Sequence, residues 1–354
     1  MVTVHLLHAI CNFTRAFANL TIFILNCPYA ENSIMKTKLT LLLYLLVSSV
    51  VYSQDISIYD IDPYEISKTE SFAFISLSDN YPLSEHPDSL AIPDQHGKSI
   101  KEIEHFKLEG KYRKRFLDKM KISGTDNVFI YDYASDLLVV LPVKDLSVVA
   151  CLNYYVSAEE GPFTQDYYMI GFEVKKSALK GFKEYYTDAF AYVGKEQPFA
   201  RGKMKPLRWK KIETKDFPAV KIDPDNQKTL LGSGGGNYWA GADYKYEADG
   251  YTYYVREIVN KENETFARRL LVMNTKTGKV VLNRFYYNSE GTSLAPLNYT
   301  TKDENYFPDQ WTGQLFKNKP PVVLGFYYMS FGCPDILFLD SSVKAIEISC
   351  DNRH

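Results

Sequence analysis

The sequence predicts a mostly β protein, with antiparallel sheets in a sandwich- or barrel-like arrangement and one or two short helices in the N-terminal half. Phe, Trp and Tyr make up 15% of the 354 residues, and strands favour aromatic side chains. Short apolar runs follow one another with brief gaps, which is typical of an antiparallel sheet. The helical crossovers of about a dozen residues that parallel strands need are missing from these gaps.

The charge balance limits the class of partner. The chain holds 41 basic and 43 acidic residues, a formal net charge of −2. A near-neutral chain lacks the basic excess of a protein that coats nucleic acid, so we expect no nucleic-acid partner. With 45% apolar residues, the composition also differs from that of a disordered charged tail.

Residues 35–53 have the pattern of a secretory signal peptide. Lys36 and Lys38 precede an apolar run at Leu39–Val51, and small residues lead to a cleavage point after Ser53. The apolar run is shorter than the roughly 20 residues that cross a bilayer. The alternatives to a cleaved signal peptide are a buried helix and an uncleaved anchor. Residues 1–34 then form a doubtful N-terminal extension, and we expect translation to start at Met35. The predicted product is exported, periplasmic or extracellular, with no membrane span after signal removal.

Residues 54–200 form a predicted N-terminal β-rich domain with a short helix. The helical pattern covers Ile100–Ile122, because Tyr112, Phe116, Leu117 and Met120 fall on one face. Gly110 indicates a break within it. The predicted strands of this domain are 72–77, 128–133, 137–143, 147–155 and 167–174, with Pro142 expected at a strand end or an edge.

A change of composition near residue 200 predicts a linker followed by a second domain. Residues 201–236 are basic and then glycine-rich, and Trp209 lies in the basic part. Residues 237–354 form a predicted C-terminal antiparallel β domain, in which Asn274–Gly278 is a hairpin loop. The predicted strands of this domain are 238–248, 250–259, 266–274, 279–288, 320–331, 335–340 and 345–349.

The cysteines predict one disulfide. Cys333 and Cys350 lie 17 positions apart, on what resembles two short strands joined by a turn. A bridge between them suits an exported chain, and the alternative is a pair of reduced, buried thiols. Cys151 lies in an apolar strand and is expected to be a small core residue and not a nucleophile.

No catalytic, metal or cofactor motif is found, so the catalytic residues stay unknown and enzymatic activity is uncertain. The glycines at 232–236 lead into sheet, whereas a phosphate-binding loop opens a helix. His86, Asp94 and His96 could meet as zinc ligands, but loop histidines facing water are the simpler interpretation, and no metal or cofactor is expected. Asp243, Glu247 and Glu257 are the first places to look for a glycosidase carboxylate pair, although strand carboxylates usually face outward.

The aromatic strands are the candidate binding surface. Tyrosines two apart on a strand share one sheet face, as in 244–247 and 251–254. Such rings suit sugar or protein recognition, and the alternative is that they pack between layers. The predicted binding residues are Tyr238, Trp239, Tyr244, Tyr246, Tyr251, Tyr253 and Trp209.

These observations predict a non-enzymatic recognition module that binds a glycan or another envelope or surface protein through an aromatic sheet face. Two other functions stay open at this level. One is a secreted polysaccharide-acting hydrolase that uses paired carboxylates. The other is a structural or assembly protein of the cell envelope.

Overall fold

The structure is a computed structural model that describes residues 56–67, 70–78, 92–152, 167–298, 309–330 and 332–350. The chain divides into two units, Met1–Ile56 and Ser57–His354, and the second is described here. The predicted extension at 1–34 and signal peptide at 35–53 lie outside the described residues. Among the residues that are described, no helix has the length and apolar character needed to cross a membrane.

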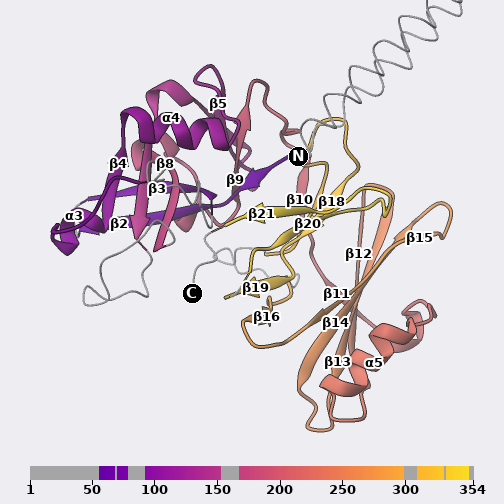
Figure 1. Cartoon of the computed structure of the whole chain (residues 1–354). Coiled ribbons are helices and arrows are strands. Elements are labelled where there is room, and N and C mark those ends of the chain that lie inside the picture. Colours follow the sequence, from indigo (N-terminus) through magenta and orange to yellow (C-terminus); the bar gives the residue numbers. More distant parts are fainter. Residues whose placement is uncertain are drawn as a thin grey trace, which may run out of the picture. The chain divides into compact units, whose positions relative to one another are not determined.

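A nine-stranded sheet joins early and late parts of the chain (Figure 1). Its neighbouring strands are antiparallel except at one place, where β1 pairs in parallel with β21 and Ile58 lies opposite Ile348. β6 is an edge strand that ends at Pro142, as predicted from the missing N–H of proline. In spatial order the strands are β10 (Met204–Pro206), β17 (Trp311–Gly313), β18 (Val322–Leu324), β20 (Asp335–Phe338), β21 (Ile346–Ser349), β1 (Ile58–Tyr59), β9 (Ala189–Gly194), β5 (Asn127–Asp132) and β6 (Leu137–Pro142).

A second, five-stranded sheet is built from the N-terminal half. Its order is β2 (Ile61–Ser67), β3 (Glu70–Ser78), β8 (Tyr168–Lys175), β7 (Ser147–Leu152) and β4 (His105–Leu108). Two helices accompany it, α3 (Ile100–Ile103) and α4 (Gly110–Lys119), and short 3₁₀ turns follow at η2 (Val143–Asp145), η5 (Lys176–Leu179) and η6 (Glu184–Tyr186). The largest core lies between this sheet, α4 and strands β5 and β9, and includes Phe116, Phe172 and Ile130.

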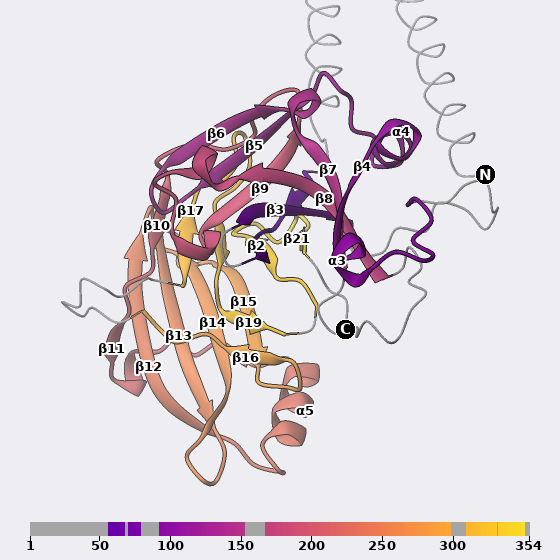
Figure 2. The same ribbon diagram turned by 90° about the vertical axis from the view of Figure 1, so that its left-hand side faces the viewer.

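A third sheet holds the tyrosine-rich strands. Its order is β11 (Lys210–Ile212), β12 (Trp239–Ala248), β13 (Tyr251–Val259), β14 (Thr265–Asn274) and β15 (Val280–Tyr287), and Figure 2 shows these strands side by side. One face packs on Val323 and Leu337 of β18 and β20. The residues of the other face pack with Leu230 of α5 (Pro224–Ser233). The remaining elements are η7 (Thr214–Asp216) and the two-stranded ribbon of β16 (Thr292–Leu294) and β19 (Tyr327–Met329).

The predicted fold class is confirmed: the chain is mostly β, with several antiparallel sheets, a half-barrel and short helices. The predicted helical stretch Ile100–Ile122 differs in detail, because strand β4 separates α3 from α4 and Gly110 begins the second helix. Phe116 and Leu117 are buried as the apolar face predicted. The expected linker at 201–236 carries β10, β11, η7 and α5, and Trp209 is anchored in the core beside them.

Candidate functional site

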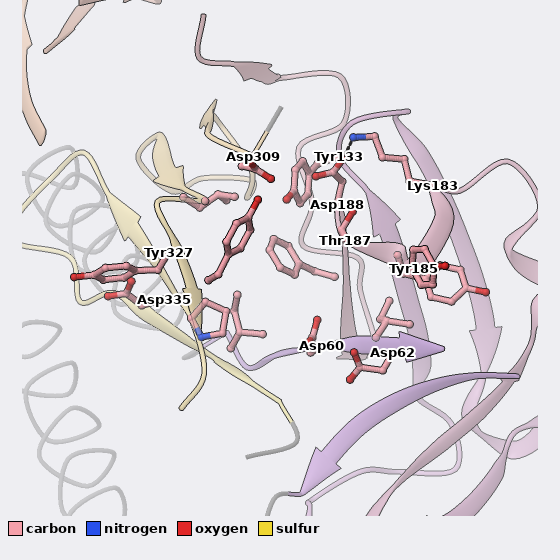
Figure 3. Close-up of a pocket in the computed structure, with 18 of the residues that line it drawn as sticks. Asp60, Asp62, Tyr133, Lys183, Tyr185, Thr187, Asp188, Asp309, Tyr327 and Asp335 are labelled. Carbon is pink, nitrogen blue, oxygen red and sulfur yellow. Dashed lines mark hydrogen bonds and ion pairs between the residues drawn. The ribbon is translucent and has the colours of Figure 1, made fainter. Parts of the chain in front are cut away.

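A cavity lined by described residues has a volume of about 730 Å³. It borders the nine-stranded sheet near the parallel pair β1–β21, and the ribbon strand β19 forms part of its wall. Aspartates and tyrosines dominate its polar lining, and Lys183 is the basic residue among those that line it (Figure 3). These residues are Asp60, Asp62, Asp188, Asp309 and Asp335, with Tyr133, Tyr185, Tyr186, Tyr327 and Tyr328.

A short loop, residues 183–188, forms one side of the cavity and is held by two aspartates. The carboxylate of Asp132, at the end of β5, accepts hydrogen bonds from the backbone N–H groups of Ala134 (3.0 Å), Ser135 (2.8 Å) and Lys183 (3.1 Å). The Lys183 ammonium then forms an ion pair with Asp188, which immediately precedes β9. The loop is therefore anchored at both ends: the Lys183 end is fixed to β5, and the Asp188 end leads into β9.

The backbone of this loop is strained. Tyr185 and Tyr186 have φ angles of 62° and 57°, a left-handed conformation that bulky residues rarely adopt. Strain of this kind costs about 1–3 kcal/mol per residue and persists only where the surroundings impose it. The side chain of Tyr186 is buried, whereas Tyr185 is 63% exposed. The strained loop therefore presents one tyrosine ring to solvent at the cavity rim.

Asp188 and Tyr133 form the buried polar centre of this wall. Asp188 is 5% exposed, and its carboxylate is hydrogen-bonded to Lys183 and to the Tyr133 hydroxyl. Burial raises the pKa of Asp188, and the hydrogen bond from Lys183 opposes part of that rise. Burial, reinforced by the charge of Asp188, also places the pKa of Tyr133 well above its usual value. Tyr133 therefore remains a neutral hydroxyl at physiological pH.

Two half-buried carboxylates, Asp60 and Asp309, come from opposite ends of the described chain. Asp60 lies between β1 and β2, where its backbone N–H donates to Ser349 of β21 (2.8 Å). Asp309 precedes β17 and lies against Gly325, where a Cβ atom would be 1.8 Å from the Asp309 carbonyl oxygen. Only glycine allows this close approach. Desolvation raises the pKa of both Asp60 and Asp309, and a hydrogen bond from Tyr328 opposes the rise at Asp309.

The opposite wall is aromatic. Tyr327 packs edge-on against Tyr286 at 4.9 Å between ring centroids, and its hydroxyl accepts a hydrogen bond from the Tyr287 N–H. Tyr328 is 51% exposed at the rim. Figure 3 shows Tyr327 beside Asp335, and Asp188 beside Lys183, with Asp60 and Asp309 at other points of the wall. The cavity thus offers ring faces at its rim and carboxylates along its walls.

Most of the predicted binding tyrosines lie in the protein core. Tyr244 and Tyr253 are buried, and Tyr246 and Tyr251 are partly buried against the same cluster, so the expected shared face is the one that packs inward. The Tyr253 hydroxyl is 2.8 Å from the Thr312 hydroxyl. Trp209 is 1% exposed and donates to Gln310 Oε1 at 3.2 Å. These rings stabilise the packing between layers, which was the alternative interpretation.

The two other predicted residues lie away from that core. Tyr238 is partly buried and packs with the residues around Leu230 of α5. Trp239 begins β12 and is 49% exposed. Of the seven predicted binding residues, Trp239 is therefore the one whose ring is largely open to solvent, and neither it nor Tyr238 lines the cavity.

The three carboxylates considered for a glycosidase pair each have a basic partner. Asp243 accepts two hydrogen bonds from Arg256, at 2.7 and 2.8 Å. Glu257 lies 3.4 Å from Arg268, and Glu247 lies 2.5 Å from Lys245. These contacts are ion pairs within the third sheet.

The predicted disulfide is confirmed. Cys333 and Cys350 form a disulfide, with a Cα–Cα distance of 5.7 Å. Cys151 is buried and packs with Phe72, Phe74 and Met169, as expected for a small core residue. Across the described ranges, no group of three or more His, Cys, Asp or Glu side chains is arranged to hold a metal ion, and His86 falls outside those ranges.

Sequence reasoning did not identify Asp60, Asp188 and Asp309 as site residues. They are far apart along the chain and belong to no motif, so only the pairing of β1 with β21 and of β5 with β9 brings them to one cavity. Tyr327 and Tyr328 belong to the aromatic residues that make up 15% of the chain, so the aromatic content was a usable signal for them. Comparison of the chain with protein-family models, with curated protein sequences and with solved structures found no match in any of the three.

Proposed function

We propose that the protein is a recognition module that binds a saccharide in the cavity lined by aspartates and tyrosines. The observation that carries this proposal is the combination of a cavity of about 730 Å³ with two exposed rim tyrosines, Tyr185 and Tyr328. The volume falls within the roughly 300–1,000 Å³ of small-molecule sites. Ring faces pack on the C–H faces of sugars, and carboxylates accept hydrogen bonds from their hydroxyls.

The proposal keeps the function predicted from the sequence and moves the site from the tyrosine-rich sheet to the cavity. Burial of Tyr253 and Trp209 leaves those rings unable to contact a ligand. Export from the cytoplasm is part of the proposal, supported by the pattern of residues 35–53 and by the disulfide, which persists in oxidising compartments. Mass spectrometry of the mature N-terminus tests the export step.

Glycan-array screening followed by calorimetry tests the binding site. Tyr185→Ala removes a rim ring that is 63% exposed, and we expect it to weaken binding of an array hit about 2- to 12-fold, since stacking contributes about 0.5–1.5 kcal/mol beyond area burial. Trp239→Ala is the matched control, because it removes another exposed ring outside the cavity. A larger loss of affinity for Trp239→Ala would indicate that the binding site lies on the tyrosine-rich sheet. An array without hits would refute saccharide binding.

A second candidate function is hydrolysis of a bound polysaccharide. The observation that favours it is that three aspartates whose pKa is raised by burial, Asp60, Asp188 and Asp309, line one cavity, since a raised pKa is the direction of shift that a general acid requires. Incubation of array hits with the protein and chromatography of the products tests it. Release of shorter saccharides by the wild type and not by Asp309→Asn would favour the hydrolase; unchanged saccharides would favour the recognition module.

A further inference from the structure

β6 is an end strand whose edge carries no charged side chain. It ends the nine-stranded sheet, and Figure 2 shows it beside β5. Proteins protect such edges with charges, with proline or by keeping the strand short. The other end strand of this sheet, β10, has three residues and contains Lys205 and Pro206. In the tyrosine-rich sheet, β11 begins with Lys210 and β15 contains Arg284. β6 has six apolar residues, of which only the last, Pro142, is of a protecting kind.

The register of β6 with β5 shows which backbone groups point away from the sheet. The Val143 N–H donates to the Asp126 carbonyl (3.0 Å), one step beyond the ladder. Bonded and non-bonded pairs alternate along an antiparallel ladder, so the odd-numbered residues of β6 direct their N–H and C=O toward β5. Leu138 and Val140 direct theirs outward, as does the Pro142 carbonyl. In the described part of the chain, these outward groups belong to no ladder and have no backbone partner.

The side chains of β6 divide between a packed face and an open one. Val139 and Leu141 pack on the largest core. Val140 points to the opposite face because side chains alternate along a strand, and it is 47% exposed. This valine lies at the middle of the open edge. A strand added there would cover its side chain and pair the outward backbone groups.

We propose that β6 is a dimerisation surface, on which a second copy of this chain adds its own β6 in antiparallel orientation about a two-fold axis at Val140. The two Val140 residues then exchange a pair of hydrogen bonds across the axis. The Leu138 N–H of each copy donates to the Pro142 carbonyl of the other. Every outward N–H of the two strands is therefore paired, and the missing N–H of Pro142 leaves no donor unused. The inference goes beyond the proposed function, because β6 does not line the cavity.

The beginning of β6 carries an acid that is held in place. Asp136 precedes the strand, and its Oδ1 accepts hydrogen bonds from the Tyr131 hydroxyl (3.0 Å) and the Gly202 N–H (2.7 Å). The same carboxylate lies 3.4 Å from Arg201, and the Asp136 side chain is 43% exposed. Since a carboxylate has about four acceptor positions, it can also bind a second cation.

The end of β6 carries charges that match those at its beginning. Lys144 and Asp145 follow the strand and are exposed. Positions 136 and 144 are equally far from 140, so the two-fold axis brings Lys144 of the second copy to Asp136. Asp145 of the second copy then approaches Arg201. A parallel arrangement would instead bring like charges together. This match of the strand with itself identifies a second copy of the chain as the partner.

Sedimentation equilibrium and light scattering measure the association. The wild type should show a reversible monomer–dimer equilibrium. Val140→Lys should raise its dissociation constant about tenfold or more, because two ammonium groups would meet at the axis. Leu231→Lys is the matched control, since it places a lysine at another exposed apolar position, on α5, and should leave the constant unchanged. Lys144→Glu should weaken the dimer severalfold at low salt and less in concentrated NaCl, which screens charges.

Cross-linking tests the arrangement directly. Opposite residues of a hydrogen-bonded antiparallel pair have Cα atoms about 5.5 Å apart, a distance that a disulfide spans. Mild oxidation of Val140→Cys should therefore give a covalent dimer, and Leu231→Cys should give none beyond that of the wild type. Circular dichroism checks that each variant is folded, and Lys144→Glu with the cross-link decides the matter if Val140→Lys is not. A wild type that is monomeric at every concentration, a dimer that Val140→Lys leaves intact, or equal cross-linking of the two cysteine variants would overturn the inference.

Discussion

Removal of the disulfide is expected to lower the free energy of unfolding by about 3 kcal/mol. Cys333 and Cys350 are separated by 17 positions. In the chain-entropy model a loop of this size removes about 11 cal/mol/K from the unfolded ensemble, which is about 3 kcal/mol at 25 °C. The closed loop contains β20 and β21, and β21 is the strand that pairs with β1. Cys333→Ala combined with Cys350→Ala makes the change without adding a buried polar group.

Urea denaturation followed by tryptophan fluorescence measures the effect, because Trp209 and Trp311 are both buried. A reductant should destabilise the wild type by a similar amount and leave the double variant unchanged, since the double variant lacks both cysteines of the Cys333–Cys350 bond. A double variant within about 0.5 kcal/mol of the wild type would refute the chain-entropy reasoning. A response of the double variant to reductant would show that another bond had been reduced.

Three further predictions concern the packing and the cavity. Arg256→Ala should lower the free energy of unfolding by about 3–5 kcal/mol because it leaves the Asp243 carboxylate buried without its partner. Denaturation of the double variant, which also carries Asp243→Ala, should show a smaller decrease in this free energy. A decrease as large as that of the single variant, or larger, would contradict the argument. Gly171→Ala should lower the free energy of unfolding by about 1–3 kcal/mol or more, as measured in a thermal melt, because its Cβ would lie 1.9 Å from the Ile75 carbonyl oxygen. Gly124→Ala, with nothing within 4 Å of the added carbon, is its control. Asp60→Asn should stabilise the protein relative to wild type at pH 7, and this stabilisation should shrink as the pH falls toward 4. A carboxyl whose pKa is raised in the folded state destabilises the fold above that pKa, and the penalty disappears when the carboxyl is protonated. A pH-independent difference in denaturation midpoints would contradict it.

Local features of the fold were predictable because their signals lie within short segments. The Asn274–Gly278 loop is an example: Asn274 Oδ1 accepts from the backbone N–H groups of Lys276 and Thr277, and Gly278 has a φ of 66°. The alternation of tyrosines likewise indicated which rings share a face. It could not show which face is buried, because that depends on β18 and β20, which come from other parts of the chain.

Long-range pairing limited the prediction of sheets and site. The predicted strands between residues 128 and 174 suggested one antiparallel sheet, but β5 and β6 belong to the nine-stranded sheet and β7 and β8 to a five-stranded one. The basic composition of residues 201–215 suggested a linker. Its lysines do face solvent, but Trp209 and Leu207 between them are buried. The cavity carboxylates depend on the same long-range pairings, so no short motif marks them.

The parallel contact between β1 and β21 has a consequence for how the chain folds during synthesis. Ile58 and Ile348 lie 290 positions apart, and β1 joins the β9–β5–β6 part of the sheet to the part formed by β10, β17, β18, β20 and β21. Pairings across so long a separation form slowly. The sheet cannot close until β21 has left the ribosome, so its completion is a late event. A nascent chain shortened before residue 346 would expose an unpaired edge of β1, which is a template for association with other chains.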